Sequence, residues 1–162
     1  GADGVVVGCL TPEGDLDLDR MKVLRNCAEG IHMTLHRAFD MCRNPCKALE
    51  EAVEMGIDTI LTSGQKDNCM DGKETLKKLI RQADGRLEIL VGSGVNAEVI
   101  RHLTEEIHAL SFHMSGKQKQ RSGMIYRNEH VNMGLPGFGE FDIFQTDEAQ
   151  IRWARQALDA WK

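Results

Sequence analysis

The sequence predicts a parallel α/β fold built as one domain over residues 1–162, because strand-like and helix-like segments alternate along most of the chain. Five apolar runs have the length and composition typical of strands, and segments with helix start and stop signals separate them. Strands that alternate with helices favour a parallel sheet whose helices lie on its outside. The expected strands are residues 4–10, 31–36, 57–62, 87–92 and 108–113.

Capping residues predict where the intervening helices begin and end. Asn44 followed by Pro45 is typical of an N-cap and a first helical position, and Gly56 is typical of the residue just past a helix. Asparagine, aspartate and threonine side chains cap helices by accepting hydrogen bonds from free backbone amides. On this basis, three further helices are expected to open at Asp71, Asn96 and Thr146.

The first residues bear on which parallel α/β fold is present. Residues 1–4 lead directly into an apolar run, as the turn after a helix does at Gly56, so we expect sequence upstream of this chain. A complete (β/α)₈ (TIM) barrel needs about 200 residues or more, and five units would then be its C-terminal part, with the first three strands missing. A complete five-stranded, doubly wound domain also fits the length, and both alternatives stay open.

The C-terminal quarter of the chain is harder to interpret. Residues 117–145 have no clean hydrophobic period, yet they are far longer than an ordinary connection. Their aromatic residues argue against full disorder, which leaves a lid or an oligomer contact as interpretations. Residues 147–161 are expected to form a helix that packs on the outside of the sheet through Ile151, Ala154, Leu158 and Trp161.

Composition and charge argue against several classes of function. With 41% hydrophobic and 28% charged residues, the chain has the profile of a globular domain. A net charge of -5 argues against nucleic acid as the main partner, and the short basic run at residues 117–121 is interpreted as a solvated loop. No apolar stretch approaches the roughly 20 residues that span a bilayer, and no secretory leader opens the chain. We therefore expect a cytosolic protein without nucleic-acid or membrane partners.

The cysteines raise the question of a metal site. Five cysteines form an odd count without the dense spacing of a disulfide scaffold, so reduced thiols are expected. Soft thiolates select Cu(I) or Zn. However, no Cys-x-x-Cys pair occurs, and the predicted helix start places Cys42 before the helix and Cys46 inside it. Buried or incidental cysteines are therefore favoured over metal ligands.

Polar residues that could carry chemistry follow the predicted strands at their carboxyl ends, where parallel α/β proteins collect their sites. His36 continues the polar face of its strand, and His113 shares that inward direction. Histidine exchanges protons near neutral pH, and arginine binds carboxylates and phosphates with a fork of donors. The candidates for an acid–base site on an anionic ligand are His36, Arg37, Asp40 and His113. The alternative is that the histidines are hydrogen-bonded lining residues and that Arg37 pairs structurally with Asp40.

Glycine turns at three strand ends could bind the same anion. Backbone amides in such turns can approach a phosphate closely, and barrels often bind phosphate after their last two strands. The residues concerned are Ser63, Gly64, Gly92, Ser93, Gly94 and Ser115. The alternative is that these turns simply require glycine.

Five segments in a fixed order carry a family resemblance. Residues 36–40 read His-Arg-Ala-Phe-Asp and residues 61–65 read Leu-Thr-Ser-Gly-Gln, and this pair is specific. The other segments are the glycine turn at 92–94, His-Met-Ser at 113–115, and Met-Ile-Tyr-Arg-Asn at 124–128 with Met133 and Gly134. Over nearly the whole chain, this order is similar to that of the CutC family of copper homeostasis proteins.

The resemblance implies a (β/α)₈ barrel with residues 1–162 as its C-terminal portion, a cytoplasmic location that can extend to the nucleus, and self-association into a homo-oligomer. It also implies a role for copper as Cu(I). The family's first three strands, with their cysteine and glutamate segments, have no counterpart here, so no metal ligand is carried over and the ligands stay unknown. The matched positions, which add Arg127 to the candidate anion ligands, are His36, Arg37, Asp40, Ser63, Gly64, His113, Ser115, Arg127 and Asn128.

Three hypotheses of function follow. The first is a protein that binds or handles copper ions, supported by the resemblance and the free thiols. The second is an enzyme for a small anionic or phosphorylated substrate, in which Arg37 and the glycine turns bind the anion and His36 or His113 acts as general acid or base, with Asp40 orienting a partner. The third is a barrel whose surface serves only as a scaffold for partners.

Overall fold

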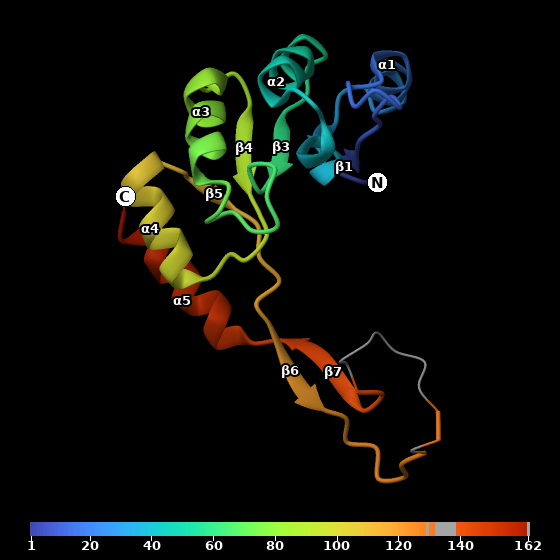
Figure 1. Ribbon diagram of the computed structural model, residues 1–162, viewed down its shortest axis with the longest axis vertical. Coiled ribbons are helices and arrows are strands. Elements are labelled where there is room, and N and C mark those ends of the chain that lie inside the picture. Colours follow the sequence, from blue (N-terminus) through green and yellow to red (C-terminus); the bar gives the residue numbers. More distant parts are fainter. Residues whose placement is uncertain (129, 132–138, 162) are drawn as a thin grey trace.

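The computed structural model describes residues 1–128, 130–131 and 139–161. Met133 and Gly134 of the family motif lie outside these residues. The chain forms one five-stranded parallel sheet with helices between its strands, and a separate two-stranded antiparallel sheet (Figure 1). The strands of the parallel sheet, each inside a predicted run, are β1 (Gly4–Val7), β2 (His32–Leu35), β3 (Thr59–Thr62), β4 (Glu88–Val91) and β5 (Ser111–Phe112).

The order of the strands in the sheet tests the doubly wound alternative. The strands lie side by side in chain order, β1-β2-β3-β4-β5, and every neighbouring pair is parallel. A doubly wound sheet reverses its strand order at a switch point, and this sheet does not. The doubly wound alternative is therefore wrong for this chain. All five carboxyl ends lie along one edge of the sheet, as expected from right-handed crossovers.

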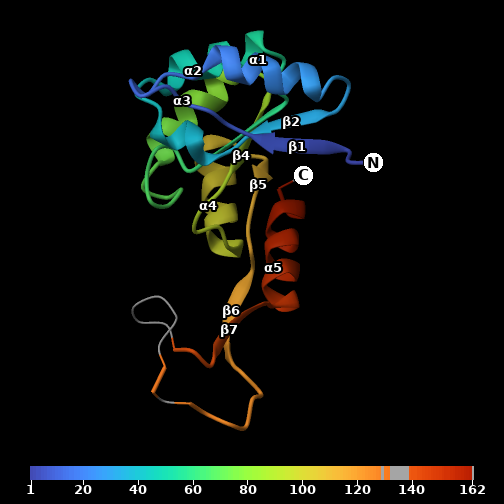
Figure 2. The same ribbon diagram turned by 90° about the vertical axis from the view of Figure 1, so that its right-hand side faces the viewer.

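In the described part of the chain, five α-helices and one 3₁₀ helix connect or follow the strands, and none of them is both long and apolar enough to cross a membrane. Figure 2 shows α1, α2 and α3 together on one side of β1 and β2. The helices are α1 (Leu18–Cys27), η1 (Arg37–Met41), α2 (Pro45–Glu54), α3 (Lys73–Ala83), α4 (Ala97–Ile107) and α5 (Glu148–Asp159).

Two of the four predicted helix caps are confirmed. The Oδ1 of Asn44 accepts from the amide of Lys47, and Asn96 accepts from two amides in the first turn of α4. Asp71 is not a cap, because α3 begins after Gly72 and the Asp71 carboxylate instead accepts from Asn68. Thr146 is not a cap either. The next residue, Asp147, caps α5 by accepting from the amide of Ala149.

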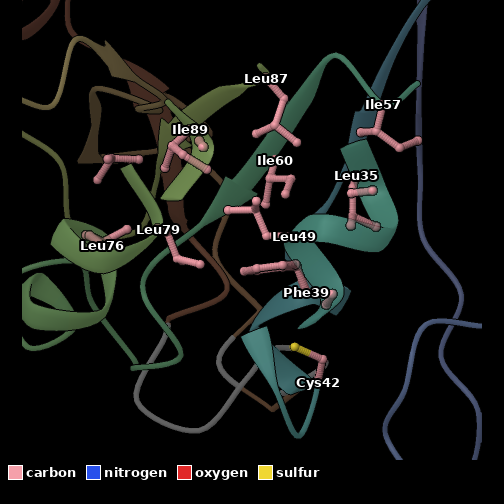
Figure 3. Packing of buried hydrophobic residues seen from close by; sticks show 14 of the residues in the cluster. Leu35, Phe39, Cys42, Leu49, Ile57, Ile60, Leu76, Leu79, Leu87 and Ile89 are labelled. Carbon is pink, nitrogen blue, oxygen red and sulfur yellow. The ribbon is translucent and has the colours of Figure 1, made fainter. Parts of the chain in front are cut away.

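The core lies between the sheet and its helices. Met33 and Leu35 of β2 are fully buried, whereas His32, the first residue of the strand, is exposed and Thr34 is half-buried. This alternation confirms that β2 has an apolar face toward the helices and a polar face away from them. Figure 3 shows Leu35, Leu49 and Leu79 pointing into this core, and burial of each such side chain stabilises the fold by roughly 1.5–3 kcal/mol.

The C-terminal segment differs from the prediction. The basic run at residues 117–121 is not a loop but strand β6 (Lys117–Arg121), which pairs antiparallel with β7 (Asp142–Thr146) in a hairpin that extends away from the sheet (Figures 1 and 2). Both faces of this hairpin are largely exposed, so its sequence shows no apolar alternation. Ladder hydrogen bonds and the ammonium of Lys117, 4.5 Å from the ring centroid of Phe144, support it.

The last helix packs mainly on another helix. In α5, Ala154 and Ala157 are buried against Ile100 of α4, and Phe112 of β5 borders this cluster. Ile151 and Trp161, which were expected on the buried side, are 39% and 42% exposed. The small alanine side chains allow α5 to approach α4 closely, and this leaves the larger residues at the margin of the contact.

Candidate functional site

His36 lies where β2 ends and η1 begins. Its amide donates to the carbonyl of Val7 at 2.9 Å, and its Nδ1 accepts from the amide of Ala38 at 3.1 Å. Because Nδ1 is an acceptor, the neutral ring carries its proton on Nε2. A Cβ added at Gly8 would lie 2.7 Å from the imidazole, so the ring lies directly against the backbone there. His36 is thus fixed in orientation and presents an Nε2–H donor.

Asp40 is the centre of the most densely hydrogen-bonded group at the carboxyl edge. Its Oδ1 accepts from the hydroxyl of Thr62 at 2.5 Å and from the amide of Gln65 at 3.0 Å. Its Oδ2 accepts from Nε of Arg37 at 2.7 Å and from the hydroxyl of Ser63 at 3.1 Å. The side chain is only 6% exposed. Asp40 therefore anchors the loop between β3 and α3 (residues 63–72) to the end of β2.

The same contacts determine the protonation of Asp40. Burial raises the pKa of its carboxyl, but hydrogen bonds from Thr62, Arg37 and the amides of Gln65 and Ser63 together outweigh burial and hold the pKa below its ordinary value. The group is therefore ionised at neutral pH. With its acceptor positions occupied by the protein's own donors, Asp40 is a positioning residue in this geometry.

Arg37 is also engaged within the protein. Besides the contact with Asp40, its Nη2 donates to the hydroxyl of Ser63 at 2.8 Å and to the carbonyl of Lys66 at 3.2 Å. Nη2 of Arg37 thus holds the β3–α3 loop directly, and Nε binds Asp40, which anchors the same loop. This is the structural pairing of Arg37 with Asp40 that the sequence left open as the alternative to anion binding.

The turn at Ser63 and Gly64 uses its amides internally. The amide of Ser63 donates to Asp40, and the amide of Gly64 donates to the hydroxyl of Thr62 at 2.9 Å. Gly64 has a φ of +74°, and its backbone crosses that of Gly72 so closely that a Cβ on Gly72 would lie 1.9 Å from the carbonyl oxygen of Ser63. Here glycine is required by close backbone approach and by a left-handed conformation.

The second glycine turn is more open. Ser93 and Gly94 have φ values of +72° and +77°, and among the described residues their amides have no backbone partner. Ser93 is tied to the β3–α3 loop, since its hydroxyl donates to the carbonyl of Asp67 at 2.5 Å. His113 is exposed beside this turn, and a Cβ added at Gly92 would lie 3.8 Å from the Cβ of His113. The structure therefore brings His113 and the Gly92–Gly94 turn together.

Two predicted anion ligands lie elsewhere. Arg127 donates to the carbonyl of Ser122 at 2.9 Å, and its guanidinium lies 4.2 Å from the ring centroid of Phe141, next to the β6–β7 hairpin. The carbonyl of Ser115 accepts from Thr146 where the hairpin meets the body of the protein. Neither contact joins these residues to the group around Asp40.

Two residues of the group around Asp40, Thr62 and Gln65, were not among the candidate site residues, although both belong to the Leu-Thr-Ser-Gly-Gln segment at residues 61–65. Thr62 had a weak signal, because it is a hydroxyl at the end of an otherwise apolar strand, and a buried hydroxyl requires a partner. Gln65 adopts a φ of +62°, and its Nε2 donates to the carbonyl of Cys42 at 2.5 Å. Nothing in a single sequence marks a glutamine for this conformation.

The cysteines do not form a metal centre in the described part of the chain, where no three histidine, cysteine or acidic side chains lie close enough to share an ion. Cys42 and Cys69 are buried in the core, and burial raises the pKa of both thiols, that of Cys42 to about 11. Cys27 and Cys46 are exposed, and Cys9 is half-buried. The thiols are thus divided between the core and separate surface positions.

This division predicts how the thiols react. Cys27 and Cys46 should react with Ellman's reagent within minutes at pH 8, whereas Cys42 and Cys69 should react only after unfolding. A thiol with a pKa of about 11 is only about one-thousandth ionised at pH 8, and the thiolate is the nucleophile. Stopped-flow absorbance with and without guanidinium chloride measures both classes. Rapid reaction of Cys42 in a Cys27→Ser, Cys46→Ser variant would contradict the buried placement.

Together, the strand order and the hydrogen-bonded carboxyl edge define a parallel α/β protein with its polar groups collected at one edge of a singly wound sheet. The CutC family model matches residues 1–118, and the chain belongs to the CutC family. A CutC family protein of Bacteroides thetaiotaomicron is 47% identical over 134 residues, which cover 83% of this chain and 54% of the relative. One from Pasteurella multocida is 37% identical over 161 residues, covering 99% and 66%.

A solved structure agrees with this membership. The crystal structure of CutC from Streptococcus agalactiae, described as a candidate copper homeostasis protein, matches with a TM-score of 0.66 at 28% identity, covering 69% of this chain and 55% of that one. This chain spans about half the length of the first of the relatives described above. Residues beyond 118, which include most of the β6–β7 hairpin and all of α5, lie outside the match to the family model.

Proposed function

We propose that this chain acts in copper homeostasis in the cytosol, with the nucleus as a further location, as the C-terminal five units of a homo-oligomeric (β/α)₈ barrel. Membership of the CutC family is the observation that carries the proposal. The sequential parallel order of β1 to β5 supports the barrel, because consecutive βα units of a barrel pair in this order.

Copper itself fits the described residues poorly. Cu(I) selects soft thiolate and thioether ligands that converge on one point. Two of the five cysteines are buried in the core, and no three histidine, cysteine or acidic side chains converge among the described residues. We therefore assign no copper-binding step to these residues, and we propose that the chain on its own has no tight Cu(I) site.

Anaerobic competition against bicinchoninate tests this proposal. The wild-type chain and a Cys9→Ser, Cys27→Ser, Cys46→Ser variant are expected to withdraw equal amounts of Cu(I) from the chelator, since the three accessible thiols do not converge. Both proteins keep the buried Cys42 and Cys69, so the comparison isolates the accessible thiols. Binding by the wild type that is about tenfold tighter or more would establish direct Cu(I) handling and overturn this part of the proposal.

We propose a second candidate function, turnover of a small anionic or phosphorylated substrate, on the basis of the fixed Nε2–H of His36. In this function His36 donates its Nε2–H to the substrate, the exposed His113 is the general acid or base, and the amides of Ser93 and Gly94 receive the anion. Arg37 and Asp40 act indirectly by holding the β3–α3 loop against the Gly92–Gly94 turn.

Thermal shift measurements with inorganic phosphate test this candidate. Phosphate should raise the Tm of the wild type in a concentration-dependent way, relative to chloride at the same ionic strength. His113→Asn should still bind phosphate at the amides of Ser93 and Gly94 but should abolish any turnover, because asparagine cannot exchange protons near neutral pH. An equal rise in Tm with chloride and with phosphate would exclude a specific anion site.

A further inference from the structure

One cavity bordered by the described residues does not lie at the carboxyl edge. A space of about 570 Å³ lies at the opposite, amino ends of β3, β4 and β5, between the loops that enter these strands. Ile80, Leu87 and Leu110 contribute apolar walls, and Glu88 and Ser111 contribute polar groups. This volume is in the range of small-molecule sites, which combine apolar walls with a few fixed polar groups.

Glu88 is held in a fixed orientation in this cavity. The hydroxyl of Thr59 donates to its Oε2 at 3.1 Å, and the hydroxyl of Ser111 donates to its Oε1 at 2.5 Å. Thr59 has only one hydroxyl proton, so its oxygen accepts from Nε2 of His32 at 2.9 Å. The four side chains form a hydrogen-bonded row across β2 to β5, and each carboxylate oxygen of Glu88 keeps one lone pair for a ligand.

The charge of Glu88 is not balanced within the described residues, where no ion pair reaches it. Arg86 borders the same cavity, but Glu50 binds its Nη1 at 2.7 Å and its Nη2 at 2.9 Å. Asp58, the other carboxylate of the lining, accepts from the amide of Met33 at 2.7 Å and has Arg25 at 3.8 Å. Glu88 is thus a fixed anion beside apolar walls, and its donors are neutral hydroxyls.

We propose that this cavity binds an organic ammonium ion. The ammonium group donates to the free lone pairs of Glu88, forming a charge-assisted hydrogen bond, and the hydrocarbon part lies against Ile80, Leu87 and Leu110. An anionic ligand would meet two carboxylates, and a neutral one would leave the charge of Glu88 unbalanced. The site lies at the other end of the strands from the carboxyl edge, so it does not depend on the function proposed there.

Titration with cyclohexylammonium chloride, followed by chemical shift changes in ¹H–¹⁵N spectra at pH 8, tests the proposal. We expect saturable binding that shifts the amide signals of residues 85–88 and 108–111. Cyclohexylmethanol and cyclohexanecarboxylate should bind at least about tenfold more weakly than cyclohexylammonium.

Two variants and a control assign the effect to Glu88. Glu88→Gln should weaken binding of cyclohexylammonium about tenfold, and Leu110→Lys, at an exposed position, should do the same by placing a cation in the cavity. Glu105→Gln removes an equivalent charge from the exposed surface of α4 and should leave the affinity unchanged. Absence of saturable binding, equal binding of the carboxylate, or unchanged affinity in Leu110→Lys and Glu88→Gln would each overturn the proposal.

Discussion

Asp40→Ala is expected to lower the free energy of unfolding by about 3–5 kcal/mol, because it removes a carboxylate that is only 6% exposed and that accepts from several partly buried donors. The substitution leaves the guanidinium of Arg37 without its carboxylate and leaves the hydroxyl of Thr62 and the amides of Ser63 and Gln65 without their acceptor. Buried donors without partners account for much of this cost.

The pH dependence of this effect has a defined sign. The folded-state pKa of Asp40 lies below the ordinary 3.8, so the ionised carboxylate contributes its full stabilisation above that value and loses it as the pH falls through the folded pKa. The difference in stability between wild type and Asp40→Asn should therefore be constant near neutral pH and should shrink below about pH 4.

Urea unfolding followed by circular dichroism at several pH values measures both effects. Asp67→Ala removes an exposed carboxylate from the same β3–α3 loop and should change stability by less than about 0.5 kcal/mol. If Asp40→Ala were no more destabilising than this control, the group around Asp40 would not anchor the loop. A difference that grows on acidification would contradict the lowered pKa.

The parts of the fold that the sequence predicted correctly are those with local physical causes. Each of the five strands lies inside an apolar run, and Asn44 and Asn96 cap helices because their side chains bond amides two or three residues away. The β6–β7 hairpin was missed because both of its strands are largely exposed and pair through backbone ladder hydrogen bonds and a few side-chain contacts, so their side chains show no apolar period.

The candidate site was predictable only in part, for the same reason. The contact of Arg37 with Asp40 spans three residues and follows from helical spacing. The contacts of Asp40 with Thr62, Ser63 and Gln65 join residues 22 to 25 positions apart, and they arise only when β2 and β3 become neighbours in the sheet. The ionic pairing could thus be inferred from the sequence, but its role in holding a loop could not.

Gly72→Ala is expected to lower the free energy of unfolding by about 3 kcal/mol. Its φ of -86° suits any residue, so the cost comes from the collision of the new Cβ with the carbonyl oxygen of Ser63, 1.9 Å away. Gly85→Ala separates this collision from backbone strain, because Gly85 has a φ of +72° and open space around it. We expect it to cost only about 1–2 kcal/mol.

The two largest effects should not be additive, because both act on the β3–α3 loop. A methyl group on Gly72 pushes Ser63 away and thereby weakens the bonds that the amide and hydroxyl of Ser63 give to Asp40. In a double-mutant cycle of Gly72→Ala with Asp40→Asn, the second substitution should therefore cost at least about 1 kcal/mol less than it does alone. Gly85→Ala with Asp40→Asn should be additive. Additivity in both cycles would mean that the crossing of Gly64 and Gly72 and the carboxylate of Asp40 stabilise the loop independently.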